Sequence, residues 1–423
     1  MAEEEAVPQG SVTNSWKSLA TAVVVAIAGC TAQREAPSRP STGDSEYLYL
    51  WTGSADSTAP DFLAVLDVRP DTGRYGALIT TLPISGGPSG PHHTEHEMPA
   101  DRQLFANGFA GGRSFIFDLR DGARPKLAGE FADRAGFAHP HSFLRLPDGN
   151  VLATFQMRHE ATGMTPGGLV EMTPAGKVIR SSSAAAPGVN PGLRPYSAAI
   201  IPALDRIVVS TTDMDEKSPY RANELQIWRL SDLTLLHTFT LPPGPRGDEA
   251  EYTAEPRLLP DGRTVIVSTF SCGLYLLDGV DGTAPAGRLV ASFPRATDTY
   301  CAIPVIVGRY VVITVPAYPA VVSLDLSDPA NPREASRLTL SSGDVPHWIA
   351  VEPNTRRVVI TGYGGLENLV LMATFDSSTG ALALDARFKE TGATESGFRL
   401  AGRTWPHGGS APGVPHGAVF SRP

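Results

Sequence analysis

The feature that most limits the possible folds of this chain is an internal repeat with a spacing of 46 to 58 residues. Each repeat holds a short apolar strand and a turn, a β-branched strand such as 265–268, an alternating strand such as 274–278, and a more polar fourth strand. Apolar runs of this length and composition are typical of buried strands. Four strands that become more polar outwards are typical of a β-propeller blade.

Counting the repeats predicts the number of blades. Repeats start near residues 93, 141, 196, 254, 301 and 347. Ahead of them we expect three strands, at 47–53, 62–68 and 75–84, and the segment from His416 to Pro423 supplies the missing first strand of that unit. The sequence therefore predicts an all-β, seven-bladed propeller with four-stranded blades over residues 47–423. Its first blade is closed by the C-terminal strand, which removes open sheet edges.

Composition agrees with this fold and excludes one class of partner. The 42 glycines and 37 prolines of the chain indicate many turns and short elements rather than long helices. The net charge is −9, and no basic run or basic patch interleaved with aromatic residues occurs. We therefore expect no nucleic-acid partner.

The N-terminal 30 residues look like an export signal. Residues 18–28 form an apolar stretch after Lys17 that is too short to span a bilayer but suits a signal peptide. The tetrapeptide 27–30 resembles a bacterial lipobox, which makes Cys30 the expected lipidation site. The acidic segment Glu3-Glu4-Glu5 is atypical of a signal peptide and favours translation from near Val12.

These features predict the organisation of the N-terminus. We expect a signal peptide with a lipobox cysteine over residues 1–30 and a flexible Ser/Pro/Thr-rich tether over 31–46. The protein would then be exported and lipid-anchored at the cell envelope, on its periplasmic or extracellular face. The alternative is a chance run of small residues before a cysteine.

Four of the ten histidines occupy equivalent places in the repeat. His93, His141 and His347 each lie six residues before a proline, and His416 lies seven residues before one. The first strand of each propeller blade lines the central channel, so we expect these four side chains to converge near one channel mouth, on blades two, three, seven and one. Four imidazoles suit copper, iron, nickel or zinc rather than calcium or magnesium. The alternative is that each histidine only hydrogen-bonds a neighbouring loop.

Further residues lie close to these positions and are candidates for additional ligands or for groups that orient the ligands. They are His92, His96, His139, His407, Glu95, Glu97, Glu255 and Cys301. A carboxylate commonly accepts the second N–H of a metal-bound imidazole, which is the role expected of the glutamates; solvated loop carboxylates are the alternative. Cys301 is a candidate soft ligand, and a disulfide with Cys272 is allowed in an exported protein.

Three stretches of the chain resemble the selenium-binding protein and methanethiol oxidase family. They are Ala59-Pro60-Asp61-Phe62-Leu63-Ala64-Val65-Leu66-Asp67-Val68, the adjacent His92-His93 after a Pro/Gly-rich loop, and Leu324-Asp325-Leu326-Ser327-Asp328-Pro329 with Pro332-Arg333. The resemblance implies a seven-bladed propeller that holds copper through histidines and oxidises methanethiol with O2 and water to formaldehyde, hydrogen sulfide and hydrogen peroxide. It also implies that His92 and His93 are among the ligands. The chain lacks the paired-cysteine motif common near the N-terminus of the family, and its segment 94–98 differs from the family pattern.

Three functions are compatible with these observations. The first is a copper-dependent oxidoreductase that oxidises a small thiol or related reductant with O2. The second is a four-histidine non-heme iron oxygenase resembling the carotenoid and stilbene cleavage enzymes, which predicts an apolar tunnel and carboxylates hydrogen-bonded behind the ligands. The third is a non-catalytic, lipid-tethered propeller that binds a partner or stores copper.

Overall fold

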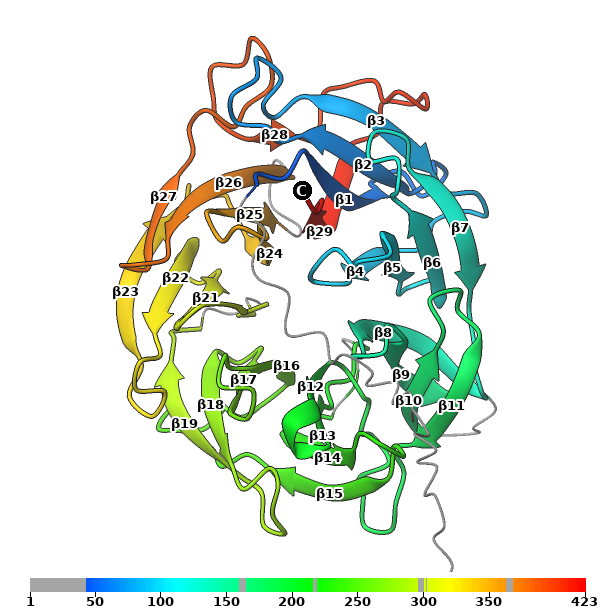
Figure 1. Cartoon of the computed structure of the whole chain (residues 1–423), viewed down its shortest axis with the longest axis vertical. Helices are drawn as coiled ribbons and strands as arrows, with labels where there is room; N and C mark the ends of the chain where they lie inside the picture. Colours follow the sequence, from blue (N-terminus) through cyan, green and yellow to red (C-terminus); the bar gives the residue numbers. More distant parts are fainter. Residues whose placement is uncertain are drawn as a thin grey trace, which may run out of the picture. The chain divides into compact units, whose positions relative to one another are not determined.

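The structure is a computed structural model that describes residues 43–159, 165–215, 218, 220–295, 300–301, 303–362 and 368–423. The expected signal peptide, Cys30 and residues 31–42 of the expected tether lie outside the described residues. Within them, the residues from Ser45 onward form a propeller of seven antiparallel sheets arranged around an axis (Figure 1). No helix in this part of the chain is long and apolar enough to cross a membrane. The one named helical element is a short 3-10 turn, η1 (Pro202–Leu204).

The first blade contains strands from both ends of the described chain. From the axis outwards it consists of β29 (Gly413–Phe420), β1 (Tyr47–Ser54), β2 (Phe62–Asp67) and β3 (Leu78–Pro83). β29 pairs with β1 in antiparallel register from Leu48 opposite Phe420 to Ser54 opposite Gly413. The predicted closure by the C-terminal strand is therefore confirmed.

The next three blades follow one another along the chain. Blade two holds β4 (Pro91–Thr94), β5 (Gln103–Gly108), β6 (Arg113–Asp118) and β7 (Lys126–Phe131). Blade three holds β8 (Phe137–Arg145), β9 (Val151–Arg158), β10 (Pro166–Met172) and β11 (Val178–Ser183). Blade four holds β12 (Ala198–Ile201), β13 (Arg206–Ser210), β14 (Glu224–Arg229) and β15 (Leu235–Thr240).

The last three blades complete the ring. Blade five holds β16 (Thr253–Leu258), β17 (Val265–Thr269), β18 (Gly273–Asp278) and β19 (Ala286–Ser292). Blade six holds β20 (Val305–Val307), β21 (Tyr310–Val315), β22 (Ala320–Asp325) and β23 (Arg333–Thr339). Blade seven holds β24 (Pro346–Val351), β25 (Arg357–Gly362), β26 (Leu369–Asp376) and β27 (Ala381–Leu384), with β28 (Phe398–Arg399) also paired to β26.

The order of polarity within a blade explains why the strands stack in this way. Second strands such as β17 and β21 are buried at every residue, because each is covered by neighbouring blades on both faces. Fourth strands such as β3 and β23 are partly or fully exposed. The core is therefore a set of apolar clusters between adjacent blades; one such cluster joins Leu48 and Phe62 of blade one to Trp348 and Val359 of blade seven.

Deletion of Pro415–Pro423 tests the closure. The deletion removes most of β29, which pairs with β1 and also contacts β24 and β4, so three blades lose contacts and β1 becomes an open edge. We expect an aggregating or unfolded product in size-exclusion chromatography and thermal unfolding. Deletion of Pro423 alone, which lies beyond β29, is the matched control and leaves the melting temperature unchanged. A soluble product of the longer deletion that melts like the full chain would contradict this architecture.

Candidate metal centre

The candidate histidines lie in irregular places of the innermost strands. The pairing of β4 with β5 shifts between Pro91 and Thr94, that of β8 with β9 between Pro140 and Phe143, and that of β24 with β25 between Pro346 and Trp348. β29 shows the same kind of shift against β1. His92, His93, His141, His347 and His416 all lie inside these shifts. Such bulges re-aim side chains and are common next to active sites.

A set of hydrogen bonds across blade boundaries holds these bulges. In each, a side chain of the second strand of one blade donates to a backbone carbonyl in the innermost segment of the next blade, over 2.5 to 3.2 Å. We call these five the inter-blade bonds. They run from Asn107 to His141, Thr154 to Tyr196, Ser210 to Ala254, Thr314 to His347 and Thr361 to His416. Each one satisfies a carbonyl in a segment where the strand ladder is irregular.

Hydrogen bonds within the blades show which residues are equivalent, and they correct the predicted register by one residue in blade two. In blades three, four and five, the residue after the accepting carbonyl donates its N–H to a side chain of the second strand of its own blade: Ser142 to Thr154, Ser197 to Ser210 and Glu255 to Ser268. In blade two the residue that does so is His93, whose N–H donates to Asn107. His92 is therefore the equivalent of His141, and His93 is an additional histidine beside it.

A signal for this register was present in the sequence but was not used. Each equivalent histidine directly follows a proline, in Pro91-His92, Pro140-His141, Pro346-His347 and Pro415-His416. The predicted register was instead aligned on the proline that follows each histidine, six or seven residues later, and this placed His93 in the equivalent position. Proline cannot donate to the strand ladder, so it marks the residue at which the bulge begins.

Asn107, which was not among the predicted site residues, fixes the backbone of two adjacent bulges. Its side-chain carbonyl accepts from the N–H of His93 at 2.6 Å, and its side-chain NH2 donates to the carbonyls of Pro140 and His141 at 3.0 and 2.9 Å. Its own backbone carbonyl accepts from the indole N–H of Trp51 at 2.7 Å. Asn107 is fully buried, so water is not at hand to replace these hydrogen bonds.

The five imidazoles gather in one place, and we call them the histidine cluster: His92, His93, His141, His347 and His416. One ring nitrogen each of His92, His93 and His416 lies within 4.8 Å of the other two. The ring of His141 is centred 4.9 Å from that of His92 and 4.5 Å from that of His93. The Nε2 atoms of His347 and His416 are 3.0 Å apart. The structure thus brings together all four predicted ligands and His92.

The hydrogen bonds indicate which nitrogens are available for a metal. His141 Nδ1 lies 2.9 Å from the carbonyl oxygen of Tyr196, which can only accept, so Nδ1 carries the proton and Nε2 carries the lone pair. That Nε2 atom is buried and has no hydrogen-bond partner among the described residues, and the same holds for Nδ1 of His92. A buried nitrogen without a hydrogen-bond partner costs free energy of folding unless a ligand binds to it.

Burial also keeps the cluster uncharged. Desolvation lowers the pKa of His141 to about 3 and that of His347 to about 4. Desolvation, together with the neighbouring imidazoles, holds the pKa values of His92, His93 and His416 well below the usual range. A metal does not therefore have to displace protons from these nitrogens at neutral pH. A neutral, all-imidazole donor set with open lone pairs fits copper, iron, nickel or zinc.

His96 lies next to the cluster but is engaged elsewhere. Its ring stacks on Trp348 with centroids 4.7 Å apart, and its Nε2 lies 3.0 Å from the guanidinium of Arg257. Because a guanidinium only donates, this Nε2 is an acceptor, and it is not open to a metal in this arrangement. Desolvation, followed by the nearby Arg257, holds the pKa of His96 well below its usual range.

The glutamates do not take the predicted role of orienting cluster imidazoles. Glu95 pairs with Arg145 at 2.7 Å, and Glu255 pairs with Arg257 at 2.7 Å and accepts from the hydroxyl of Ser197 at 2.5 Å. The only imidazole within ion-pair distance of Glu255 among the described residues is His96, at 3.9 Å. Glu97 is exposed. The backbone carbonyl of Tyr196 fills this role for His141.

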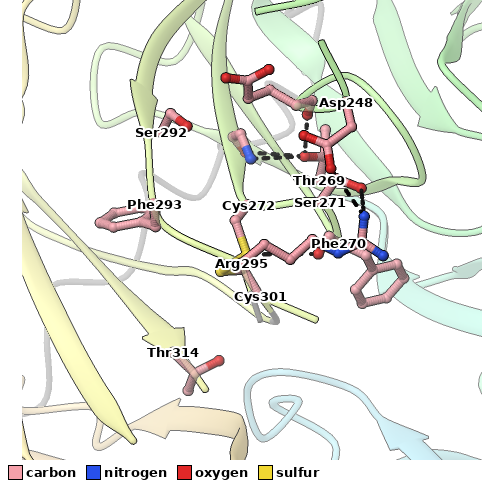
Figure 2. The surroundings of a disulfide bond; sticks show 12 residues. Asp248, Thr269, Phe270, Ser271, Cys272, Ser292, Phe293, Arg295, Cys301 and Thr314 are labelled. Atoms are coloured by element: carbon pink, nitrogen blue, oxygen red, sulfur yellow. Dashed lines mark hydrogen bonds and ion pairs between the residues drawn. A yellow bond between two sulfur atoms is a disulfide. The ribbon is translucent and has the colours of Figure 1, made fainter. Parts of the chain in front are cut away.

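Three further candidates lie apart from the cluster. Cys301 forms a disulfide with Cys272, so of its two predicted alternatives the disulfide is confirmed and the soft metal ligand is not (Figure 2). His407 packs on Phe62 and hydrogen-bonds through Nδ1 to Thr81 of the outermost strand β3, at 2.7 Å. His139 contacts the ring of Phe109, which itself contacts His92 and His141 and so lies between them and His139. No ring contact joins His139 or His407 to the cluster among the described residues.

Two aromatic side chains lie against the histidine cluster. The hydroxyl of Tyr196 is 3.5 Å from Nε2 of His93, and the Tyr196 ring is centred 3.9 Å from that of His141. Trp348 lies 5.0 Å from His93 between ring centroids and donates its indole N–H to the carbonyl of Ala418 at 2.9 Å. Burial holds the pKa of Tyr196 well above its usual range, so its hydroxyl keeps its proton.

Sequence comparisons give partial matches. A methanethiol oxidase from Hyphomicrobium sp is 35% identical over 145 residues, which is 33% of this chain and 32% of that protein. A methanethiol oxidase from Ruegeria pomeroyi is 30% identical over 33% of this chain and 32% of its own length. Selenium-binding protein 3 from Arabidopsis thaliana is 28% identical over 25% of each. This chain is a relative of the methanethiol oxidases and selenium-binding proteins. Each match spans a third or less of either protein, and no family model matches the chain.

Comparison with solved structures supports the fold. A selenium-binding protein from Sulfolobus tokodaii superposes with a TM-score of 0.71 over 90% of this chain and 94% of its own, at 15% identity. A periplasmic gluconolactonase from Pseudomonas aeruginosa superposes with a TM-score of 0.60 over 89% of this chain and 99% of its own, also at 15% identity. Both are too distant in sequence to add more than the propeller architecture.

Substitution Asn107→Ala tests how the site is held. It removes three buried hydrogen bonds, those to the N–H of His93 and to the carbonyls of Pro140 and His141. We expect a loss of about 3 kcal/mol in the free energy of unfolding, roughly 1 kcal/mol per lost bond, and weaker metal binding. Chemical denaturation and metal titration measure both.

Asn331→Ala is the matched control for this test. Asn331 is exposed and hydrogen-bonds only to Asp328 within its own turn, so a change below about 0.5 kcal/mol is expected. Equal stability losses in the two variants would contradict the role given to Asn107.

Proposed function

We propose that this protein is a copper-dependent oxidoreductase that oxidises a small thiol with O2 at the histidine cluster. The observation that carries the proposal is the buried set of neutral imidazoles, with the lone pair of His141 Nε2 left open, in a chain related to methanethiol oxidases. Partners in this proposal are a small-molecule substrate and O2. For methanethiol the balanced reaction consumes one O2 and one water and yields formaldehyde, hydrogen sulfide and hydrogen peroxide.

The residues of the chain have distinct parts in this proposal. His92, His93, His141 and His416 would hold the metal, with His347 beside them, since its Nε2 is 3.0 Å from that of His416. Copper, when bound, would supply the one-electron chemistry that couples oxidation of a thiol to reduction of O2. The bulges orient the imidazoles, and burial at 8% exposure or less for His92, His93, His141 and His416 excludes bulk water. The protonated hydroxyl of Tyr196 is a hydrogen-bond donor at the edge of the cluster.

One observation makes the iron oxygenase the weaker alternative: the partners of the nearby glutamates. That reading predicts carboxylates hydrogen-bonded behind the ligands, whereas Glu95 and Glu255 pair with Arg145 and Arg257. The Nδ1 of His141 instead donates to a backbone carbonyl. Copper is therefore our first choice of metal and iron the second, while a non-catalytic propeller predicts no turnover at all.

Substitutions His93→Ala and His141→Ala test the proposed function. Each removes one imidazole from a buried, closely spaced set, so we expect the copper content of untagged protein to fall from about one per chain to less than a tenth, and thiol-dependent peroxide production to be abolished. Elemental analysis and a peroxide assay with methanethiol give the two measurements.

His159→Ala is the matched control, because His159 is exposed and pairs only with Asp133 among the described residues. Both measurements are expected to be unchanged in it. Full activity in either cluster variant would reject the proposal, iron in place of copper would favour the oxygenase, and a folded protein that binds no metal would favour a binding role.

We also propose that the protein is exported and anchored through a lipid on Cys30, at the periplasmic or extracellular face of the cell envelope. The lipobox-like segment 27–30 motivates this location. The disulfide between Cys272 and Cys301 is compatible with it, because such bonds persist mainly in oxidising compartments.

The substitution Cys30→Ser tests the anchor. We expect the unaltered protein in the membrane fraction with an acylated N-terminal peptide that begins at Cys30, and the variant in the aqueous fraction, since one lost cysteine removes the site of lipid attachment. Mass spectrometry of the N-terminal peptide is the measurement. Recovery of an unprocessed peptide containing Glu3-Glu4-Glu5 would refute the proposal.

A further inference from the structure

The mouth of the channel has two chemically different sides. At the equivalent positions, blades seven, one, two and three carry histidines, whereas blade four carries Tyr196 and blade five carries Ala254. Tyr196, Ala254 and Phe270 pack together in a small apolar cluster of their own, with Met214 and Tyr252 against it. We call Tyr196, Ala254 and Phe270 the apolar side.

The apolar side begins at the histidine cluster and leads to the surface. Tyr196 contacts His141 and His93, with ring centroids 3.9 and 5.8 Å away. Phe270 follows at 5.4 Å from Tyr196, and Tyr300 at 6.1 Å from Phe270. Tyr196 is fully buried, Phe270 is 9% exposed and Tyr300 is 46% exposed. A continuous row of aromatic rings therefore runs from the proposed metal ligands to solvent.

The disulfide helps to fix Phe270 in this row. The carbonyl of Phe270 accepts from the N–H of Cys301 at 3.1 Å, and its N–H donates to Tyr252 at 2.9 Å. Cys272, two residues later, has a left-handed backbone with φ of 68°. Its bond to Cys301 joins the turn after β17 to the segment that leads into blade six, and Figure 2 shows Phe270 beside this bond.

Among the described residues, the charged groups found beside this side are paired. Glu255 and Arg257, the charged groups that act on the hydroxyl of Tyr196, pair with each other at 2.7 Å. Arg295, which lies over the ring of Tyr300, pairs with Asp248 at 3.1 Å. A ligand placed against the apolar side would gain from burying an alkyl group and would find no partner for a charged one.

We infer that the apolar side binds the alkyl group of a small uncharged thiol and directs its sulfur toward the histidine cluster, so that Phe270 and Ala254 set which thiols are accepted. This inference rests on the proposed function. Each buried methylene changes binding by about fourfold. Selectivity for short alkyl thiols over cysteine, whose amine and carboxylate are charged, follows because the apolar side offers alkyl contacts and the described charges beside it already pair with one another.

The test compares Phe270→Ala and Ala254→Leu with the unaltered, metal-loaded protein. KM and kcat are measured for methanethiol, ethanethiol, 1-propanethiol and cysteine, together with metal content. We expect Phe270→Ala to raise KM for ethanethiol about tenfold or more, and Ala254→Leu to raise KM more for 1-propanethiol than for methanethiol, with metal content unchanged. Phe270→Leu, which keeps the apolar contact, should stay within about threefold of the unaltered protein.

Phe293→Ala is the matched control. Phe293 is also a buried phenylalanine near the disulfide, since its N–H donates to the carbonyl of Cys272, but it packs in a different cluster with Leu259 and Ile266. It should lower stability without changing KM. Equal KM changes in Phe270→Ala and Phe293→Ala, or no dependence on chain length in Ala254→Leu, would overturn the inference. If Phe270→Ala does not fold, the KM values of Phe270→Leu and Ala254→Leu decide whether the inference holds.

A second measurement separates this inference from the proposed function. Dimethyl sulfide, an apolar probe without a thiol, is added to chelator-treated protein and its contact is followed by saturation-transfer NMR. We expect a signal in the unaltered protein that falls at least threefold in Phe270→Ala and not in Phe293→Ala. A signal with this pattern in a protein that oxidises no thiol would refute the proposed function and keep the inference. No difference between the variants would refute the inference alone.

Discussion

The inter-blade bonds are the interactions on which the rest of the site depends. A bulged strand cannot pair all of its backbone groups within its own sheet, and a buried carbonyl without a partner costs about 1–3 kcal/mol. Five innermost segments therefore take a donor from the second strand of the preceding blade, as His416 does from Thr361 and His141 from Asn107. The side chain in the bulge is thus positioned by a neighbouring blade. The candidate metal ligands are held by the ring rather than by any single sheet.

This dependence explains how five imidazoles, four of them buried, can lie so close together. Neutral histidines avoid mutual repulsion, and desolvation keeps them neutral. The cost is a set of nitrogens such as His92 Nδ1 and His141 Nε2 that lack partners in the described part of the protein. A rigid ring can hold such groups together because the packing between blades opposes their relaxation. A metal would then satisfy nitrogens that the fold has already brought together.

Much of this could be predicted from the sequence, because the fold follows from local patterns. Runs such as 265–268 and 358–361 predicted buried strands, and their spacing predicted seven blades and closure by the segment from His416. The convergence of His141, His347 and His416 followed from the spacing alone. The exact register did not, because it depends on where the bulge begins, and His92 rather than His93 proved equivalent. The roles of Asn107 and Arg257 could not be found either, since each acts on residues of another blade that are at least 33 positions away in the sequence.

The order of the blades around the ring also gives the site a histidine side and an apolar side. Histidines occupy the four contiguous blades that include the closing blade, and Tyr196 and Ala254 occupy the next positions around the axis. His92 and His416 come from opposite ends of the propeller sequence, yet their ring centroids are 4.2 Å apart, so this contact exists only once β29 has paired with β1. Ring closure is therefore also the step that completes the ligand set. The apolar side does not depend on that step, because Tyr196, Ala254 and Phe270 come from consecutive blades and their contacts form within one continuous segment of the chain.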